Sequence, residues 1–269
     1  MSAVGTFEHL RVETPRPGVV LATLDREEQL NALTFEMFDT LRDLCTRVEA
    51  DPQARVLVIT GAGRGFCSGL DLDAAGELSS MPAPEMLARQ EGWAAGIAAL
   101  RLLPKPVIAA VNGAAAGAGF GLALAADIRI ASSAARFNAA FVRVGLSGGD
   151  VGVSWMLPRI VGLGRASEIM LTGRMIGAEE AERMGMVNRV VDPDRLLDAA
   201  LEVAEAITAN SPFGMRLTKQ VLQSNVDAPS LEAALALENR NQVLATRTDD
   251  MQEALAAFRA KRPPRFTGR

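Results

Sequence analysis

Short, almost continuously apolar runs alternate with longer amphipathic segments over the first 200 residues of the chain. Residues 55–60 and 106–112 are apolar at nearly every position, which is typical of strands covered on both faces of a sheet. Between residues 31 and 50, apolar side chains recur every three or four positions, which predicts a helix with Thr34 as its N-cap. Alternating buried strands and amphipathic helices predict an α/β protein built in layers.

The same signals predict the other elements of this region. Residues 71–92 are polar, contain Pro82 and Pro84 and show weak periodicity, so we expect a partly mobile loop there that leads into a helix. Further strands are expected at 8–13, 19–24, 127–131 and 187–190, and further helices at 85–102, 117–126, 153–161 (interrupted near Pro158) and 178–184.

The pattern changes after about residue 195, where strand signals stop. Helical periodicity runs through 195–210, 212–224, 231–246 and 249–261. We therefore expect a core in residues 1–200 and a C-terminal helical subdomain in residues 201–269.

Composition excludes several kinds of chemistry. The 269 residues include one His and two Cys. One imidazole, His9, and two distant thiols, Cys45 and Cys67, cannot form a His/Cys zinc site and leave little room for a catalytic triad. The formal net charge of −4 creates no basic field for nucleic acid. We expect no metal, no nucleic-acid partner and, because there is no disulfide framework, a cytoplasmic protein.

No segment has the pattern of a membrane anchor or a secretory signal. The most apolar stretch, residues 107–126, is interrupted by Asn112 and several glycines, whereas a spanning helix needs roughly 20 apolar residues in a row. The N-terminus lacks a basic start followed by an apolar run. We therefore expect a soluble protein without a membrane partner.

Two glycine-rich turns follow predicted buried strands, at residues 61–71 and 112–121. Small residues allow a ligand to approach the backbone closely, and the second turn runs into a predicted helix whose first N–H groups are free. Two such turns can direct two backbone donors at one negative charge, as an oxyanion hole does. Tight packing of helix on strand explains the glycines equally well. Neither turn has the complete glycine pattern of a dinucleotide-binding loop, so a dehydrogenase is disfavoured.

Several segments in a fixed order resemble one family. Asn31–Leu33, Gly65–Asp71, Lys105–Gly113 and Ala125–Asp127, with Leu157–Leu163, Thr172–Arg174, Gly185–Asn188 and Lys261–Phe266 downstream, are similar to the crotonase (enoyl-CoA hydratase/isomerase) superfamily. This resemblance implies a spiral of repeated ββα units, a C-terminal helical region used in trimerisation, and homotrimers or hexamers. It also implies an acyl-CoA thioester substrate and no separate cofactor, since coenzyme A is part of the substrate.

The resemblance also assigns roles to individual residues. It places the two oxyanion donors at the backbone N–H groups of Ser68 and Ala118. Contacts to the substrate are implied for Gln29, Leu30, Ala32, Gly69, Leu70 and Asp71, and for Lys261, which matches a terminal lysine that reaches the CoA phosphate.

This sequence departs from the hydratase pattern at both catalytic glutamates, because those positions contain Gly121 and Phe141. Hydration needs a base to activate water and an acid to protonate carbon, and neither glycine nor phenylalanine can do either. Asp150 lies in the loop where some relatives have a catalytic Asp. It is either the acid/base group or the N-cap of a helix that begins near Val151.

We therefore expect an enzyme of the enoyl-CoA hydratase/isomerase type that stabilises a thioester enolate. With Asp150 as its single acid/base group, double-bond isomerisation is favoured over ordinary hydration. The alternative is a catalytically weak family member that binds acyl-CoA or acts as a scaffold.

Overall fold

A repeating unit of a long strand, a short strand and a helical segment builds the core. The computed structural model describes residues 4–269. The long strands of the repeats are β3 (Val56–Gly61), β5 (Val107–Val111) and β7 (Ile128–Ser132), and the short strands are β4 (Gly65–Cys67), β6 (Ala114–Ala116) and β8 (Arg136–Asn138). Helices α2 (Leu72–Glu77) and α3 (Ala83–Leu102) follow the first pair, α4 (Ala118–Ala125) the second, and α5 (Val153–Val161) and α6 (Leu163–Thr172) the third.

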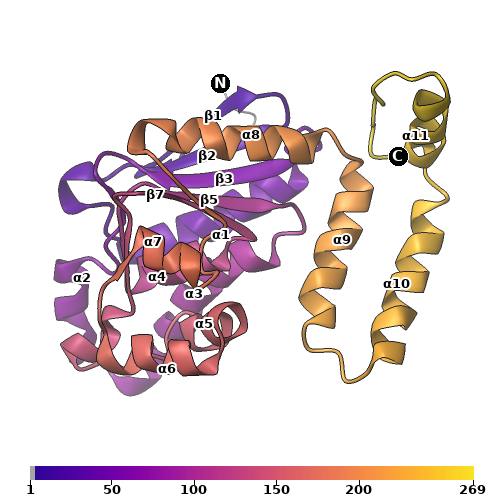
Figure 1. The fold of residues 1–269 in the computed structure, drawn as a ribbon. Coiled ribbons are helices and arrows are strands. Elements are labelled where there is room, and N and C mark those ends of the chain that lie inside the picture. The colour runs from indigo at the N-terminus through magenta and orange to yellow at the C-terminus, as the bar shows by residue number, and fades with distance from the viewer. Residues whose placement is uncertain (1–3) are drawn as a thin grey trace.

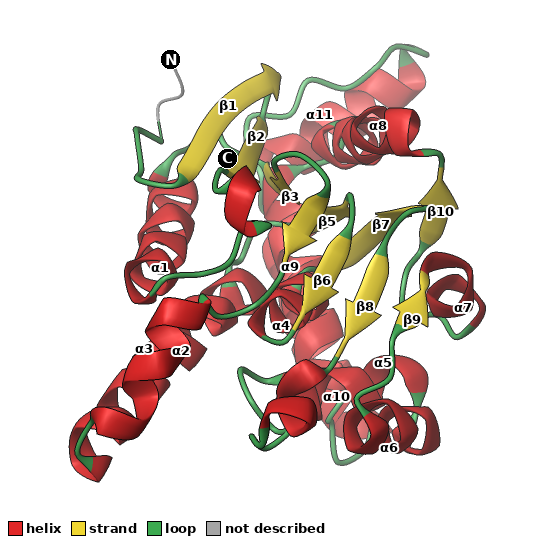
Figure 2. Cartoon of the chain, turned by 90° about the vertical axis from the view of Figure 1, so that its left-hand side faces the viewer, coloured by secondary structure: helices red, strands yellow, loops and turns green. Residues whose placement is uncertain are grey.

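Long strands pair with long strands and short strands with short ones, which makes two sheets. The larger sheet has the order β1-β2-β3-β5-β7-β10, where β1 (Leu10–Arg16) runs antiparallel to β2 (Val19–Leu24), and β10 (Arg189–Val191) closes the other edge. The smaller sheet has the order β4-β6-β8-β9, with β9 (Ile176–Gly177) antiparallel to β8. Figure 2 shows β6, β8 and β9 side by side next to the larger sheet. The α/β spiral predicted from the sequence is confirmed.

Helices cover both faces of the larger sheet, as its nearly all-apolar strands require. Val56 and Val58 pack with residues of α8 (Leu196–Thr208) on one face. Leu57 and Ile59 point to the other face and join the main core with residues of α1 (Phe35–Ala50), α3 and α4. Figure 1 shows α8 on one side of the larger sheet and α1, α3 and α4 on the other. This alternation follows from the two-residue period of a strand. The last core helix, α7 (Ala178–Arg183), precedes β10.

The structure differs from the expected elements in three ways. Residues 71–92 are mostly helical, because α2 fills the first part of the expected loop and α3 begins at Ala83. Helix α6 was not predicted. The short strands of the smaller sheet were not predicted either, because strands of two or three residues have no periodicity to detect. Helix α5 continues through Pro158, because one missing backbone donor costs less than the burial of Leu157 and Val161 supplies.

Three helices form an arm that extends from the core: α9 (Pro212–Asn225), α10 (Leu231–Ala245) and α11 (Asp249–Arg259). Figure 1 shows α9 and α10 standing beside the core as a helical hairpin, with α11 and the C-terminus at its end. The boundary expected at residue 200 falls inside α8, which packs on the larger sheet, so the arm itself begins at Pro212. None of the helices in residues 4–269 is long and apolar enough to cross a bilayer.

Candidate active site

The two glycine-rich turns lie against each other in the structure. Gly69, after β4, has a φ of +103°, and a Cβ on it would lie 2.9 Å from the carbonyl oxygen of Ala116 and 3.6 Å from the amide nitrogen of Ala118. Only glycine allows both this backbone angle and this close approach. The first turn is therefore seated directly on the N-terminus of α4.

In the first turn, the Ser68 amide is already used. Its N–H donates to the carbonyl of Leu30 at 3.1 Å, and its hydroxyl donates to the carbonyl of Gln29 at 3.3 Å. The Gly69 N–H faces the buried sulfur of Cys67. The structure therefore does not favour Ser68 as an oxyanion donor, because its amide hydrogen points at another part of the protein.

The Leu70 N–H, unlike that of Ser68, points away from its neighbouring segment. Leu33 donates to the carbonyl of Gly69 at 2.7 Å and accepts from Asp71 at 2.9 Å, so it pairs with Leu70 in a parallel bridge. In such a bridge the N–H of the middle residue points to the opposite side. Among the described residues the Leu70 N–H has no acceptor. The resemblance predicts the first donor at Ser68, whereas the amide of this turn without an acceptor within residues 4–269 is that of Leu70, two positions later.

The second turn presents the Ala118 amide at a helix start. Gly117 has a φ of +53° and is the N-cap of α4, and Ala118 is the first residue of that helix. The N–H groups of a first turn have no acceptor within their helix, and the helix dipole favours negative charge there. Ala118 therefore lies at the start of a helix, and its role as the second donor stays a prediction.

Two asparagine side chains hold the first turn in shape. The buried Asn31 amide donates to the carbonyls of Ala62 and Gly65, and Asn112 donates to those of Gly63 and Gly65. This role of Asn112 was not found from the sequence, because its acceptors are backbone groups.

Of the substrate contacts expected in this region, Asp71 has a structural partner. Its carboxylate accepts a hydrogen bond from Arg26 at 2.9 Å and another from the backbone N–H of Asp73. Through the second of these bonds Asp71 is the N-cap of α2. The hydrogen bond from Arg26 lowers the pKa of Asp71. Arg26 also donates to the carbonyl of Ala32, so the segment 29–32 and the first turn form one unit.

Both positions that contain glutamate in hydratases are packed with apolar groups. A Cβ on Gly121 would lie 2.7 Å from a methyl group of Val151. Phe141 is buried, and its ring lies 3.8 Å from the position of a Cβ on Gly117. Val151 itself has a φ of +41°, an unfavourable angle for a β-branched residue. The apolar side chain of Val151 therefore occupies the space where the first glutamate would begin.

Asp150 precedes Val151 and is half-buried beside this contact. Its Oδ1 accepts hydrogen bonds from the side-chain amide of Gln90, at 2.6 Å, and from the N–H of Val151, at 2.8 Å. Burial raises the pKa of the Asp150 carboxyl, and the hydrogen bonds from Val151 and Gln90 act in the opposite direction. The N-cap alternative is wrong, because α5 begins at Val153 with Gly152 as N-cap and has no side-chain cap.

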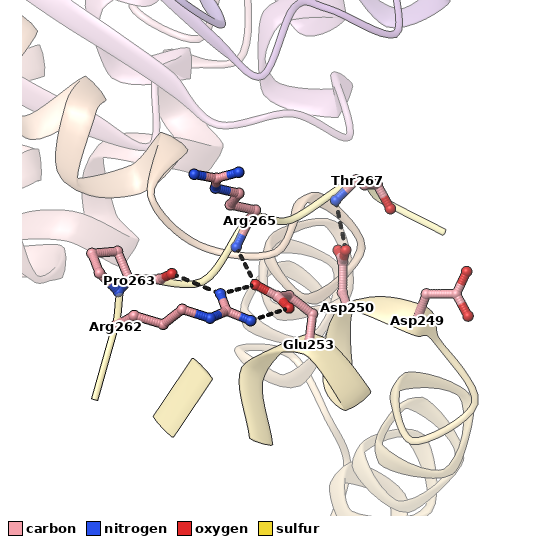
Figure 3. Close-up of a pocket in the computed structure, with 7 residues that line it drawn as sticks. All are labelled: Asp249, Asp250, Glu253, Arg262, Pro263, Arg265 and Thr267. Atoms are coloured by element: carbon pink, nitrogen blue, oxygen red, sulfur yellow. Dashed lines mark hydrogen bonds and ion pairs between the residues drawn. The ribbon is translucent and has the colours of Figure 1, made fainter. Parts of the chain in front are cut away.

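Lys261 lies on the arm, separate from the two turns. It is exposed and follows α11, in a left-handed backbone conformation with φ of +51°. Figure 3 shows the pocket formed by the adjoining tail, where Arg262 donates to both carboxylate oxygens of Glu253 at 2.6 and 2.9 Å, and the Thr267 N–H donates to Asp250. These contacts fold the tail back onto α11.

Comparisons with known proteins agree with this geometry. A family model described as enoyl-CoA hydratase/isomerase matches residues 14–269. The chain is 45% identical over 267 residues to a probable enoyl-CoA hydratase, echA12, of Mycobacterium bovis, covering 97% of this chain and 94% of the relative. It is 42% identical to the 1,2-epoxyphenylacetyl-CoA isomerase of Escherichia coli, with coverage of 94% and 96%. The crystal structure of an enoyl-CoA hydratase from Bacillus anthracis superposes with a TM-score of 0.92 at 34% identity, covering 97% of this chain and 100% of that one.

Proposed function

Because this chain belongs to the enoyl-CoA hydratase/isomerase family, we propose that it moves a carbon–carbon double bond within an acyl-CoA thioester. The family expected from the sequence is confirmed, and so is an enzyme that acts on acyl-CoA. The observation that carries the finer proposal is the set of acids at the site. Gly121 and Phe141 replace both hydratase glutamates, whereas Asp150 is half-buried and hydrogen-bonded in the loop packed against α4.

The proposed mechanism uses two amides and one carboxylate. The thioester oxygen of a 3-enoyl-CoA accepts hydrogen bonds from the N–H groups of Leu70 and Ala118. Asp150 removes a proton from the α carbon, and the electron pair of that C–H bond is delocalised onto the thioester oxygen as a dienolate. Asp150 then returns the same proton to the γ carbon, which leaves the double bond between the α and β carbons. One group removes and returns the proton, so no second acid is needed.

The name of one relative supports this choice of reaction. The Escherichia coli protein is named an isomerase of an acyl-CoA, and it is 42% identical to this chain. A raised pKa also suits Asp150 to its role, because a carboxyl that is less acidic than usual is a stronger base when ionised.

The test compares the wild type with Asp150→Asn on two substrates, a 3-enoyl-CoA for isomerisation and crotonyl-CoA for hydration. We expect the wild type to isomerise much faster than it hydrates, and the variant to lose isomerisation by about 10²- to 10⁴-fold. An unchanged rate in Asp150→Asn, or hydration as fast as isomerisation in the wild type, contradicts the proposal.

The apolar packing at Gly121 and Phe141 also favours a second candidate, a protein that binds acyl-CoA with little turnover. Exchange of the α protons of an acyl-CoA in deuterated water separates the two. Exchange supports an active oxyanion hole and base, and tight binding without exchange supports the second candidate.

We also propose that the arm joins copies of this chain into a homotrimer or hexamer. The arm exposes many large apolar side chains, which isolated monomers rarely do; they include Leu231, Leu235, Val243, Leu244, Leu255 and Phe258. Lys261 lies at the end of the same arm and is the proposed contact to the CoA phosphate of a neighbouring copy. Light scattering coupled to size-exclusion chromatography measures the mass, and a monomer contradicts this assembly.

A further inference from the structure

A single hydrogen bond connects α3 with the Asp150 loop. The side-chain amide of Gln90 donates to Oδ1 of Asp150 at 2.6 Å, across 60 positions of sequence. The Val151 N–H donates to the same oxygen at 2.8 Å. Oδ2 of Asp150 has no hydrogen-bond partner among the described residues. The two carboxylate oxygens therefore differ, because one is held by two donors and the other is free.

The backbone that carries Gln90 is firmly placed. Trp93, three residues along the same helix, stacks on Phe35 of α1 with ring centroids 4.5 Å apart and an angle of 6° between the planes. At Gly96, α3 approaches α1 so closely that a Cβ would lie 2.5 Å from the carbonyl oxygen of Phe38. Gln90 thus projects from a helix packed tightly on the core.

The Asp150 loop, on the other side of this hydrogen bond, is also held by packing. Val151 packs a methyl group against α4 at Gly121, one turn after the Ala118 amide. The Asp150 loop is therefore attached both to the helix that provides an oxyanion donor and, through Gln90, to α3.

The charged side chains next to Gln90 and before the Asp150 loop make other contacts or are exposed. On α3, Arg89 pairs with Glu85 at 3.0 Å and Glu91 is exposed. Arg143, from the turn before the loop, lies along Gly173. None of the described charged groups forms an ion pair with Asp150 or contributes to its pKa. Within residues 4–269, the Gln90 amide is therefore the one side chain that donates a hydrogen bond to this carboxylate.

We propose that Gln90 is a positioning residue for Asp150: it holds Oδ1 so that Oδ2 is directed to the substrate and moves the proton. This inference rests on the proposed function of Asp150 as the acid/base group. A neutral amide is suited to the task, because it donates to the carboxylate and cannot itself take up the proton. A donor to the ionised form also limits how far burial raises the pKa.

The sign of the pH effect follows from this contact. Without the Gln90 donor, the ionised form of Asp150 loses stabilisation and its pKa rises further. The reaction needs ionised Asp150 in the free enzyme, so the acidic limb of the kcat/KM profile moves to higher pH. One charge-assisted hydrogen bond corresponds to a shift of about one pH unit.

The experiment compares Gln90→Met, which keeps the length and removes the donor, with Glu91→Gln, an exposed control on the same turn of α3. For Gln90→Met we expect kcat on a 3-enoyl-CoA to fall about tenfold at neutral pH, with little change in KM and with the shifted acidic limb. The ¹³C NMR titration of the Asp150 carboxyl, assigned by its loss in Asp150→Asn, should move in the same direction. The control should leave both readouts unchanged.

The double variant Gln90→Met/Asp150→Asn separates positioning from a general structural role. If Gln90 acts through Asp150, the double variant is no slower than Asp150→Asn, whereas independent effects multiply. An unchanged pH profile and NMR titration in Gln90→Met, or multiplied losses, overturn the role of Gln90 while leaving Asp150 intact. An unaffected Asp150→Asn overturns both proposals, and that result identifies the proposed function as the one that failed.

Discussion

The core and the arm of this protein are built by different physical rules. In the core, β5 and α4 are buried at every position. In the arm, only Lys219, Asn241, Asp250 and Ala257 of the three helices are buried, and three of these four side chains are polar. The core buries its apolar surface within the chain, whereas the arm leaves much of its apolar surface exposed.

Several of the contacts between arm and core are polar as well. The Lys219 ammonium group donates to Asp127 at 2.6 Å and to the carbonyl of Lys105 at 2.9 Å, and Gln223 donates to the carbonyl of Arg101 at 2.7 Å. Directional contacts of this kind orient a helix, but they bury little apolar surface. The comparison shows that the core buries its apolar surface within the chain, whereas the arm leaves exposed the apolar surface that the proposed association with another copy would cover.

Matched phenylalanine substitutions test this contrast most strongly. Phe120 is fully buried in α4, and Phe258 is 83% exposed on α11. We expect Phe120→Ala to lower the free energy of unfolding by about 3–5 kcal/mol. Phe258→Ala should change the free energy of unfolding of the monomer by less than about 0.5 kcal/mol. It should also weaken association when the two variants are compared at the same protein concentration. Urea unfolding and light scattering measure the two effects, and similar losses of stability would remove the distinction.

Matched glycine substitutions sharpen the comparison at a smaller scale. Gly121→Glu would place its side chain against Val151, so we expect overpacking and a buried carboxylate to cost about 2–3 kcal/mol. Adding Val151→Gly should recover much of that loss, because it opens the space and suits the positive φ. On the arm, Gly214→Ala meets only ordinary contacts and should raise stability by up to about 1 kcal/mol. If Gly121→Glu were tolerated alone, the missing glutamate would not be explained by packing.

The smallest effect is expected at the exposed ion pair of the arm. The Arg262 guanidinium lowers the pKa of Glu253 to about 2. Because this pKa is depressed on folding, the contribution of the pair is present above the usual value of 4.5 and is lost as the pH falls through about 2. Arg262→Met should return the Glu253 pKa toward 4.5 in a ¹³C NMR titration, with little change in the unfolding transition. A large drop in global stability would show that the tail contacts matter more than surface contacts usually do.

The sequence by itself determined the strands of the larger sheet, most of the helices and the two turns. The apolar runs that became β3 and β5 can be stable only when covered on both faces, and the glycines at 69 and 117 mark backbone angles that other residues avoid. The absence of carboxylates at positions 121 and 141 was also readable directly. Each of these signals is local, since the composition of a short segment limits what that segment can do.

The tertiary structure alone decided which groups of the candidate site lie together. Pairing with Leu33 leaves the Leu70 amide, rather than that of Ser68, without an acceptor among the described residues. The packing of α3 on α1 brings Gln90 to Asp150, and Gly152 takes the cap position that Asp150 could have filled. These outcomes depend on the direction of backbone groups and on contacts between residues far apart in the chain, and neither leaves a pattern in a short stretch of sequence.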